Sequence, residues 1–454
     1  MNPRDRSVVD TIAAVATAPG RGAVGIVRLS GPSALLIAEK ITGSLAPARL
    51  SALREFRDET GALIDHGLLT CFPAPHSYTG EDVVELHGHG GPVVMDLLLH
   101  AACVQGARPA RPGEFSERAF LNGRLDLAQA EAVADLIDAS SRAAVIAANR
   151  SLDGEFSRRR MALAEAMMDL RVFVEGALDF SDEDVDWLSD SQLQQRLQQA
   201  QQDLESLLAA AAQGRRLRDG LVLAIAGRPN VGKSTLLNRL AGTDAAIVSD
   251  VPGTTRDVLR ENLLVDGLPL TVIDTAGLRD TDDVIEAEGI RRAWLALGKA
   301  EVTLFVIDDC EGITEQDRAL MARLPQGVQV LPIFNKCDLS GRLPQRFEHE
   351  GLSAIRLSAA VDQGMNLLRD AIREVAGFSI ALEGVFSART RHIDALGQAQ
   401  TRLMAARLHL STGGAAELAA EDLRCAHAAL GEITGRVTTE DLLGAVFSRF
   451  CIGK

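Results

Sequence analysis

The hydrophobic residues of this chain follow two different periods, and the changes between them divide the sequence into four segments. In residues 1–122, runs with the two-residue period of a strand alternate with runs that repeat every three to four residues. The predicted strands are 23–29, 63–72 and 82–87, and the predicted helices are 35–41 and 93–104. Turn signals rich in glycine separate these elements. The segment is therefore predicted to be a compact α+β domain.

Helical spacing alone governs residues 123–218 and returns in residues 378–454. The predicted helices are 127–137, 163–174, 192–208, 393–408, 415–433 and 438–447. Between these two segments, residues 219–377 alternate strands with helices, and the predicted strands are 221–226, 268–274, 303–308, 328–335 and 355–358. That alternation is typical of a parallel α/β sheet. The sequence thus predicts a multidomain α+β protein in which one α/β domain is inserted into one helical domain.

Composition narrows the classes of function. The formal net charge is −15, so nucleic acid would have to bind a local basic patch against an unfavourable overall field. The arginine groups at 158–160 and 215–218 form such a patch or are ordinary solvated helix faces. Six scattered cysteines without a C-x-x-C pair suit a reducing cytoplasm and offer no metal site. No apolar run reaches roughly 18 residues, and Asp10 interrupts the one signal-like segment, so no membrane anchor is expected.

A phosphate-binding loop is predicted at Gly227–Ser234, where GRPNVGKS fits the pattern G-x-x-x-x-G-K-[ST] without a mismatch. A strand pattern precedes the loop and a helical pattern follows it, which is the context that the motif requires. The glycines allow the backbone N–H groups to face phosphates at the helix N-terminus. We expect Lys233 to meet the β- and γ-phosphates and the Ser234 hydroxyl to bind Mg²⁺.

Two more motifs are expected to contact the Mg²⁺ ion and the γ-phosphate. Asp274–Gly277 reads DTAG after a strand, so its aspartate can hold Mg²⁺ through water and its glycine can sense the γ-phosphate. Thr254 and Thr255 lie in a polar loop from which a hydroxyl can join the Mg²⁺ shell, and we assign Thr255 to that role. Both motifs follow the phosphate loop in the order that a nucleotide site needs.

Base recognition is predicted at Asn335–Asp338, which reads NKCD at the end of a strand. The Asp338 carboxylate can accept two hydrogen bonds from guanine, and adenine offers no such pair. The loop Ser358–Ala360 can complete the base pocket with a backbone N–H group. The full set of predicted GTP-binding residues is Asn230, Val231, Gly232, Lys233, Ser234, Thr235, Ser249, Asp250, Val251, Pro252, Gly253, Thr254, Thr255, Asp274, Thr275, Ala276, Gly277, Asn335, Lys336, Cys337, Asp338, Ser358, Ala359 and Ala360.

These motifs together resemble those of the Ras-like, translation-factor-class GTPases. Within this class the chain is similar to the branch that carries a hydrophobic residue, here Leu278, in place of the catalytic glutamine. Another group must then orient the attacking water, and another positive charge must replace an arginine finger. In potassium-dependent members of this branch the phosphate-loop asparagine helps to bind K⁺, and Asn230 matches it. An ordinary loop hydrogen bond is the alternative role for Asn230. The K⁺ ligands that the resemblance implies are Asn230, Ser249, Val251 and Thr254.

Outside the α/β segment, four stretches resemble the MnmE (TrmE) family of tRNA modification GTPases. These stretches are 17–31, 78–91, 111–139 and the C-terminal CIGK at 451–454, and the likeness covers essentially the whole chain. The resemblance implies that residues 1–122 dimerise and bind a tetrahydrofolate derivative, either the 5-formyl or the 5,10-methylene form. It also implies a helical domain formed by 123–218 and 378–454, which carries a GTPase domain at 219–377.

Carried over by position, the implied folate contacts are Arg28, Glu85, Arg124 and Lys454. Arg124 stands where a lysine is expected, so its charge is kept while its geometry is not. The bland alternative is a disordered tail and a dimerisation domain without a pocket.

Three further roles follow from the resemblance. Glu286 matches the switch carboxylate that positions water, although Glu288 is a competitor two residues on. Cys451 matches a tail cysteine tied to the modification step, and a buried apolar cysteine is its alternative role. With Lys233, these two residues form the predicted catalytic set. His87 and His89 are predicted to be structural rather than metal ligands, because no further ligands accompany them.

The function that the resemblance implies is K⁺-stimulated GTP hydrolysis in a cytoplasmic homodimer. With the flavoprotein MnmG (GidA), such a protein adds a carboxymethylaminomethyl-type group to C5 of the wobble uridine of certain tRNAs. A ribosome-assembly GTPase is the runner-up, because it shares the phosphate loop and DTAG. Such proteins usually carry a second GTPase domain or an RNA-binding KH domain, and this sequence has one set of nucleotide motifs. A pure signalling switch is the third reading, against which the CIGK tail argues.

Overall fold

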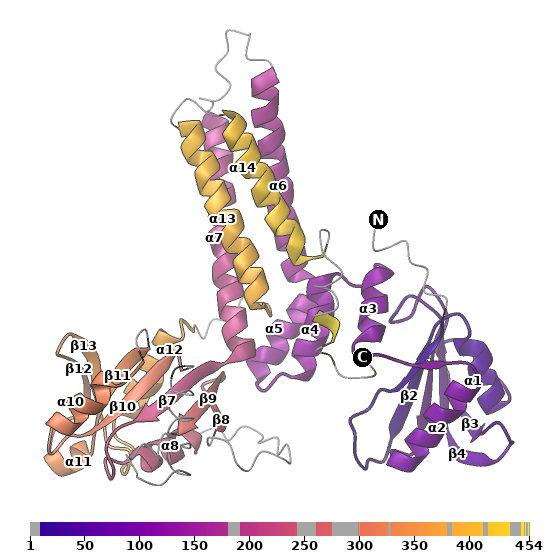
Figure 1. The fold of residues 1–454 in the computed structure, drawn as a ribbon, viewed down its shortest axis with the longest axis horizontal. Helices are drawn as coiled ribbons and strands as arrows, with labels where there is room; N and C mark the ends of the chain where they lie inside the picture. The colour runs from indigo at the N-terminus through magenta and orange to yellow at the C-terminus, as the bar shows by residue number, and fades with distance from the viewer. Residues whose placement is uncertain are drawn as a thin grey trace. The chain divides into compact units, whose positions relative to one another are not determined.

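The computed structural model describes residues 10–179, 191–242, 260–274, 298, 300–325, 328–378, 384–411, 416–435, 446–448, 450 and 453. Contacts divide the chain into two compact units. The first unit consists of Met1–Ala134, Leu152–Gln201 and Ala395–Lys454, and the second consists of Asp135–Ser151 and Gln202–Asp394. The first unit contains an N-terminal sheet and much of the helical domain, whereas the second contains the α/β sheet (Figure 1).

The N-terminal sheet has six strands in the order β3-β4-β5-β2-β1-β6. All neighbouring strands run antiparallel except β1 and β6, which run parallel. The strands are β1 (Ile12–Val15), β2 (Gly25–Ser30), β3 (Ser51–Arg57), β4 (Leu63–Phe72), β5 (Val83–Gly88) and β6 (Arg108–Pro109). The alternation of side chains along β1 sends Ala13 into one core cluster and Ile12 and Ala14 into another.

Helices cover this sheet because its core-facing side chains need apolar partners. The helices are α1 (Ala34–Thr42), α2 (Pro92–Val104) and α3 (Glu114–Leu121). Ile37 of α1 and Leu98 of α2 share one core with Val27 of β2. Phe115 of α3 packs with Ile12 in the other cluster. The predicted α+β domain is therefore confirmed, with helices α1 and α2 packed against one face of its sheet.

The helical domain is built from α4 (Leu127–Ile137), α5 (Arg142–Leu152), α6 (Glu155–Asp179), α7 (Ser191–Asp219), α13 (Thr390–Ser411) and α14 (Ala416–Ile433). The long helices α6 and α14 pack along each other (Figure 1). In the described part of the chain, no helix is both long and apolar enough to cross a membrane. The helix predicted at 438–447 lies almost wholly outside the described residues.

The α/β sheet has seven strands in the order β12-β13-β11-β10-β7-β9-β8. Strands β13, β11, β10, β7 and β9 run parallel, and the two outermost strands run antiparallel to their neighbours. The strands are β7 (Leu221–Ala226), β8 (Arg260–Val265), β9 (Leu268–Asp274), β10 (Val302–Asp308), β11 (Gln329–Asn335), β12 (Gln345–His349) and β13 (Leu352–Arg356). Its helices include α8 (Lys233–Ala241), α10 (Glu315–Ala322), α11 (Cys337–Ser340) and α12 (Met365–Val375).

The central strands of this sheet are buried on both faces. Every residue of β10 is buried, with Leu304 in one core cluster and Phe305 in another. A continuous apolar run of this kind is the pattern expected for a parallel strand between two helical layers. Because parallel strands end at a common edge, the loops after β7, β10 and β11 gather there. That edge is where the nucleotide motifs meet.

Candidate functional site

The phosphate loop needs glycine at two positions for reasons that the structure makes explicit. Gly227 has φ +141°, and a Cβ atom there would lie 2.3 Å from the carbonyl oxygen of Val306 on β10. Gly232 has φ +97°, and its Cβ atom would lie 2.3 Å from Nδ2 of Asn335. Asn230, between them, also has a positive φ of 64°, which asparagine tolerates better than most residues. The loop is thus pressed against the ends of two neighbouring strands.

The ammonium group of Lys233 lies inside the curl of this loop. Its Nζ atom donates hydrogen bonds to the carbonyl oxygens of Gly227 at 2.8 Å and Arg228 at 2.7 Å. Ser234 and Thr235 follow in the first turn of α8, and both are exposed. Backbone N–H groups in the first turn of a helix point out of its N-terminus, so this loop presents backbone donors and one cation on the side where phosphates would bind.

Asn335 joins the phosphate loop to the predicted base pocket. Its side-chain Nδ2 donates to the carbonyl oxygen of Val231 at 2.8 Å, and its Oδ1 accepts the backbone N–H of Ala359 at 3.0 Å. The Asn335 residue is only 3% exposed, so both bonds are shielded from water. Asn335 therefore acts by holding two loops together, since both polar atoms of its amide are already engaged.

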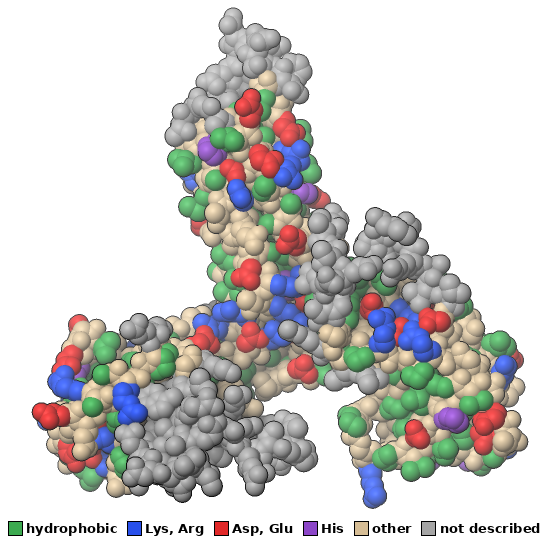
Figure 2. All heavy atoms as spheres, viewed as in Figure 1, with side chains coloured by type: hydrophobic (Ala, Val, Ile, Leu, Met, Phe, Trp, Pro, Cys, Tyr) green, Lys and Arg blue, Asp and Glu red, His purple; other side chains and the backbone are tan. Residues whose placement is uncertain are grey.

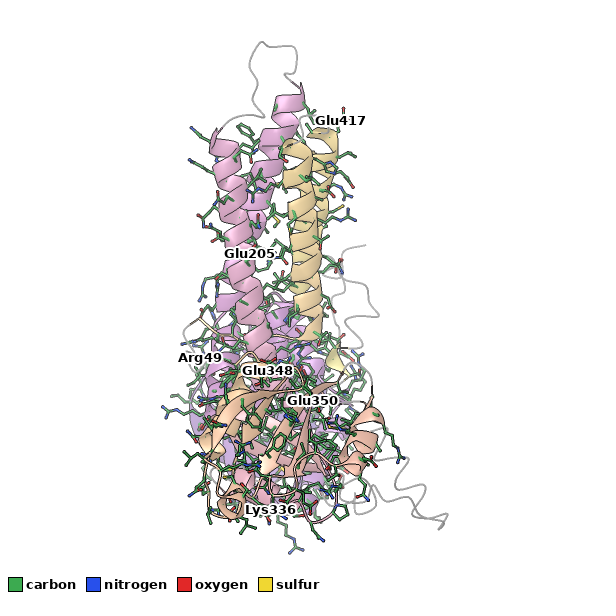
Figure 3. The ribbon with its side chains drawn as sticks, turned by 90° about the vertical axis from the view of Figure 1, so that its left-hand side faces the viewer. Arg49, Glu205, Lys336, Glu348, Glu350 and Glu417 are labelled. Atoms are coloured by element: carbon green, nitrogen blue, oxygen red, sulfur yellow. The ribbon has the colours of Figure 1, made fainter. Side chains whose placement is uncertain are left out.

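The base-recognition motif is held by acidic residues that end β10. Lys336 has φ +72°, and its Nζ atom lies 2.6 Å from Oδ2 of Asp308. Burial acts to raise the pKa of Asp308, but the hydrogen bond and charge of Lys336 outweigh it and hold that pKa below its ordinary value. Asp338 is exposed in the first turn of α11, as recognition of a base requires. Figure 3 shows Lys336 at the end of the GTPase domain opposite Glu348 and Glu350.

Asp309, which follows β10, fixes the base-recognition motif through buried contacts. Its carboxylate is fully buried and accepts hydrogen bonds from Ser340 at the end of α11 and from Arg356 Nε at 2.9 Å. Its backbone N–H donates to the carbonyl oxygen of Asn335 at 2.8 Å. The predicted motif thus stands on a second acidic residue that the sequence analysis did not single out. The adjacent pair Asp308–Asp309 after an apolar strand was the available signal.

The last part of the predicted base pocket is fastened to α8. Arg239 donates from Nε to the carbonyl oxygen of Ala359 at 3.1 Å and from Nη2 to that of Ala360 at 2.8 Å. Ser358 is fully buried beside them. One region therefore contains the phosphate loop and the residues predicted for the base pocket, whose role in base binding stays a prediction: Asn335, Lys336, Cys337, Asp338, Ser358, Ala359 and Ala360.

Arg228 ties the start of the phosphate loop to α10. Its Nε atom donates to Asp317 at 2.9 Å, and its Nη2 atom donates to Glu311 at 2.6 Å. Asp317 is fully buried and also caps α10, where it forms a capping box with Thr314. The hydrogen bond to Glu311 raises the pKa of Arg228. One buried carboxylate thus positions both a helix and the phosphate loop, and the sequence analysis missed it.

In the N-terminal domain, two predicted folate contacts form a pair. Arg28 on β2 and Glu85 on β5 lie opposite each other in register, and Arg28 Nη2 is 2.9 Å from Glu85 Oε1. His87 Nε2 lies 3.2 Å from the other carboxylate oxygen of Glu85. That hydrogen bond, followed by the charge of Arg28, lowers the pKa of Glu85 against the effect of burial. The ring of Tyr78 lies 5.7 Å from the Arg28 guanidinium and completes a polar and aromatic cluster.

The C-terminal tail reaches this cluster. Arg28 Nη1 donates to the carbonyl oxygen of Gly453 at 3.5 Å. Gly453 has φ +95°, and a Cβ atom there would lie 2.3 Å from the carbonyl oxygen of Val15 on β1. Arg124 is exposed, and its side chain packs beside Gly80, two residues after Tyr78. A glycine before the final residue is thus required by the approach of the tail to the sheet.

The two histidines of the glycine loop have separate carboxylate partners. His87 contacts Glu85, whereas His89 Nδ1 lies 2.8 Å from Asp65. Among the residues that the structure describes, no three His, Cys, Asp or Glu side chains gather as a metal site would require. These contacts favour the structural role predicted for both histidines.

Comparison with known proteins identifies the family. The family model for the MnmE helical domain matches residues 127–451, and the model for the GTP-binding protein TrmE N-terminus matches residues 11–124. A tRNA modification GTPase MnmE from Nitrosococcus oceani is 52% identical over 451 residues, which cover 99% of this chain and 98% of that protein. The one from Methylococcus capsulatus is 53% identical over 445 residues, covering 98% of this chain and 99% of that protein.

The chain belongs to the MnmE family of tRNA modification GTPases. Two solved structures match parts of the chain. A variant of Era from Aquifex aeolicus bound to GDP and AlF₄⁻ is 26% identical, covers 40% of this chain and 66% of its own, and has a TM-score of 0.29. The G domain of the FeoB iron transporter from T. maritima is also 26% identical, covers 34% and 98%, and has a TM-score of 0.27. Scores this low add nothing to the family assignment.

As a member of the MnmE family, the protein is a GTP hydrolase. The described part of the predicted nucleotide site consists of the phosphate loop, the base motif and the loop at 358–360. The other predicted site residues lie outside the described residues. They are Ser249, Asp250, Val251, Pro252, Gly253, Thr254, Thr255, Thr275, Ala276, Gly277, Glu286, Cys451 and Lys454. Asp274 ends β9, as predicted for a residue that opens the DTAG motif.

Proposed function

We propose that this MnmE-family protein is a K⁺-stimulated GTP hydrolase whose cycle gates the modification of C5 of the wobble uridine in certain tRNAs. The proposed partner is the flavoprotein MnmG (GidA), and the proposed product carries a carboxymethylaminomethyl-type group. The observation that carries the proposal is the coexistence, in one chain, of a complete phosphate loop and an Arg28–Glu85 pair met by the C-terminal tail. A simple nucleotide switch needs only the first of these.

The hydrolytic step is proposed to depend on Mg²⁺ and K⁺. The exposed Ser234 hydroxyl at the start of α8 suits Mg²⁺, with Thr255 as the second hydroxyl ligand. Asn230 is exposed in a left-handed conformation within the phosphate loop and offers an amide oxygen to K⁺. Leu278 cannot orient water, so Glu286 is the proposed water-positioning carboxylate, with Glu288 as its competitor. The K⁺ ion would supply positive charge where other GTPases use an arginine finger.

The one-carbon step is proposed to use a tetrahydrofolate derivative beside β2 and β5. A pterin ring presents a 2-amino-4-oxo edge that suits the Glu85 carboxylate, and the anionic glutamate tail of folate suits Arg28, Arg124 or Lys454. A cavity of about 1070 Å³ opens next to the tail, and Val15, Arg21 and Phe450 are among its lining residues. When bound, the cofactor would supply a one-carbon unit, and Cys451 is the tail residue proposed to act near it.

A homodimer is proposed to form through the N-terminal domain. Leu53 on β3 and Leu68 on β4 are cross-strand partners, and they are 69% and 44% exposed. Leu63, the first residue of β4, is 47% exposed, and apolar side chains are visible on this domain in Figure 2. Neighbouring exposed leucines on one sheet face are typical of a surface that a partner covers. Five described cysteines are free thiols, which suits the proposed cytoplasmic location.

The test of the proposed function is wobble-uridine modification in cells that lack the gene. We expect the hypomodified base to accumulate in total tRNA and the wild-type gene to restore the modified form, measured by mass spectrometry of nucleosides. Unchanged modification in the deletion strain would reject the function. Calorimetry with 5-formyltetrahydrofolate tests the cofactor separately: the full chain should bind at micromolar concentration, and Arg28→Gln or deletion of 451–454 should weaken binding without changing GTP hydrolysis.

A further inference from the structure

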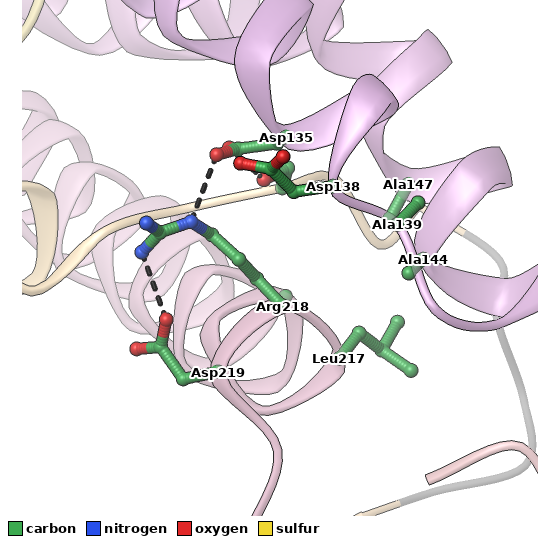
Figure 4. Close-up of a pocket in the computed structure, with 10 residues that line it drawn as sticks. Asp135, Asp138, Ala139, Ala144, Ala147, Leu217, Arg218 and Asp219 are labelled. Atoms are coloured by element: carbon green, nitrogen blue, oxygen red, sulfur yellow. Dashed lines mark hydrogen bonds and ion pairs between the residues drawn. The ribbon is translucent and has the colours of Figure 1, made fainter. Parts of the chain in front are cut away.

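Both ends of the inserted GTPase domain meet at one buried carboxylate. Asp135, in the last turn of α4, is 8% exposed. Arg218, just before β7, donates from Nε to Asp135 Oδ1 at 2.8 Å (Figure 4). Where the chain returns from the GTPase domain to the helical domain, the Ser387 hydroxyl donates a hydrogen bond to Asp135 Oδ2. Arg389 donates from Nη2 to Asp135 Oδ1 at 2.9 Å. The chain therefore enters and leaves the GTPase domain through contacts with the same side chain.

Backbone contacts hold the returning segment as closely as the ion pairs do. The Ser387 N–H donates to the carbonyl oxygen of Ala147 on α5 at 3.0 Å, and the Ser151 hydroxyl donates to the carbonyl oxygen of Ser387 at 2.9 Å. On α7, a Cβ atom at Gly214 would lie 1.7 Å from the carbonyl oxygen of Phe386. The segment is thus fixed between α5 and α7, and Asp135 connects both sides.

The charge balance at this junction makes Asp135 the group on which the others depend. One buried carboxylate faces two guanidinium groups, and such charge-assisted hydrogen bonds are stronger than neutral ones. Arg218 also pairs with Asp219 at 2.8 Å. A small cavity of about 100 Å³ is lined by Asp135, Arg218 and the exposed Asp138 (Figure 4). Removing the Asp135 charge takes that carboxylate away from the half-buried Arg218 and Arg389, so we expect the junction to loosen.

Helix α4 continues from this junction to the C-terminal tail. Its first half contributes Leu127 and Ala130 to a core cluster with Phe447 and Phe450. Three residues beyond Phe450, Gly453 contacts Arg28. A displacement of the last turn of α4 would therefore change the packing of Phe447 and Phe450, which precede the tail. A chain of packed elements is a physical route for coupling, and only a measured coupling establishes it.

We propose that Asp135 is a positioning residue that couples the nucleotide state of the GTPase domain to the C-terminal tail through α4. It does not contact the nucleotide. Strand β7, with six residues, separates the junction from the phosphate loop, a distance of about 20 Å at 3.3 Å per residue. The inference rests on the proposed function, because the tail matters only if modification chemistry takes place beside it.

The test compares Asp135→Asn with the matched control Asp138→Asn in the full-length protein. Hydrogen exchange is measured with GDP and with a non-hydrolysable GTP analogue, in peptides that contain Phe447 and Phe450. In the wild type and in Asp138→Asn, we expect exchange to differ between the two nucleotides. In Asp135→Asn, we expect this difference to shrink at least fivefold, while GTP hydrolysis stays within about twofold of the wild type. Arg389→Met should give the same result and serves if Asp135→Asn does not fold.

The outcomes separate the inference from the proposed function. A nucleotide-dependent difference that persists in Asp135→Asn and Arg389→Met, or one that is absent in the wild type, overturns the coupling. A parallel loss of hydrolysis also overturns it, because a merely structural defect would lower both. None of these measurements requires tRNA, so they remain decisive if the modification assay fails. In cells in which the wild-type gene restores modification, Asp135→Asn should restore at least tenfold less.

Discussion

The side-chain amide of Asn335 donates a hydrogen bond to the backbone carbonyl of Val231, 2.8 Å away and 104 positions earlier in the chain. The two atoms join the base-recognition motif to the phosphate loop. Since the same amide also accepts the N–H of Ala359, three loops are fixed relative to one another by one buried side chain. The proposed nucleotide site is therefore held in shape by the protein itself, through the buried side chain of Asn335.

Replacing Asn335 by alanine should weaken binding of GTP and GDP about tenfold to 100-fold. Each broken buried hydrogen bond leaves an unsatisfied partner, at roughly 1–3 kcal/mol, and the loops lose their common anchor. The loss should be similar for guanine and xanthine nucleotides, because the amide acts on the loops. Fluorescent-nucleotide titration measures the affinity. A loss confined to guanine nucleotides would show direct base contact instead.

Asp338→Asn should change base preference from GTP toward xanthosine triphosphate. The exposed carboxylate in the first turn of α11 is the charged acceptor proposed for the guanine 2-amino group. An asparagine offers a donor that suits the second carbonyl of xanthine. Competition between the two nucleotides in a direct binding assay measures the switch. Unchanged GTP affinity would place base recognition elsewhere.

GTP hydrolysis should be about 10³-fold faster in K⁺ than in Na⁺ at matched ionic strength, because the ion replaces an arginine finger. Asn230→Ala should remove most of this difference and leave the rate in Na⁺ nearly unchanged. Steady-state phosphate release in the two salts measures both effects. Equal rates in K⁺ and Na⁺ would rule out a potassium site. Dilution should reduce the K⁺ effect if the second GTPase domain of the dimer orders the ion site.

Glu286→Ala should slow hydrolysis and leave nucleotide affinity nearly intact. A carboxylate that orients water acts mainly in the transition state, so its loss lowers kcat rather than binding. Glu288→Ala is the matched control, two residues away. Single-turnover hydrolysis with bound GTP separates the two. A larger loss from Glu288→Ala would move the catalytic role to that residue.

Glu114→Gln should destabilise the N-terminal domain by about 1.5–3 kcal/mol at neutral pH, because it removes a buried charge that pairs with Arg118. Arg118 keeps Asp10 and Glu81 as partners, so its own charge stays compensated. Burial alone would raise the pKa of Glu114, but hydrogen bonds from Arg108 and the backbone of Arg111, with the nearby charges, lower it to about 2. Scanning calorimetry of the full chain measures the change. The control is Glu55, which forms an exposed ion pair with Arg57. Glu55→Gln should change stability by less than about 1 kcal/mol.

The lowered pKa of Glu114 also determines how the stability of the protein changes with pH. The pKa of Glu114 is lower in the folded protein than its ordinary value of 4.5, so its contribution is complete above pH 4.5. It is lost progressively as the pH falls from 4.5 toward about 2. The wild type should therefore lose more stability than Glu114→Gln over this range. Parallel acid unfolding curves for the two proteins would contradict the assigned ion pair.

Much of the fold follows from local pattern. Strands β4 and β9 begin and end where the hydrophobic period predicts, and the phosphate loop lies between β7 and α8 as its motif requires. The period fails for β1, β3, β6, β8 and β12, and all of these except β1 are outermost strands of their sheets. Edge strands face solvent and carry charged residues, so their apolar alternation is weak. The largely buried strands β10 and β11 keep the continuous apolar run from which they were predicted.

The sequence by itself predicted the chemistry, because each proposed phosphate, guanine or metal motif is a short run of residues whose spacing favours one local backbone shape. Only the tertiary structure decided which side chains support them. Asp309 pairs with Arg356, which lies 47 positions later in the sequence, and Asp135 pairs with Arg389, which lies 254 positions later. No sequence signal names the partner of either aspartate, because that partner is set by how distant elements pack rather than by the neighbouring residues. Long-range ion pairs therefore appear only once the chain is folded.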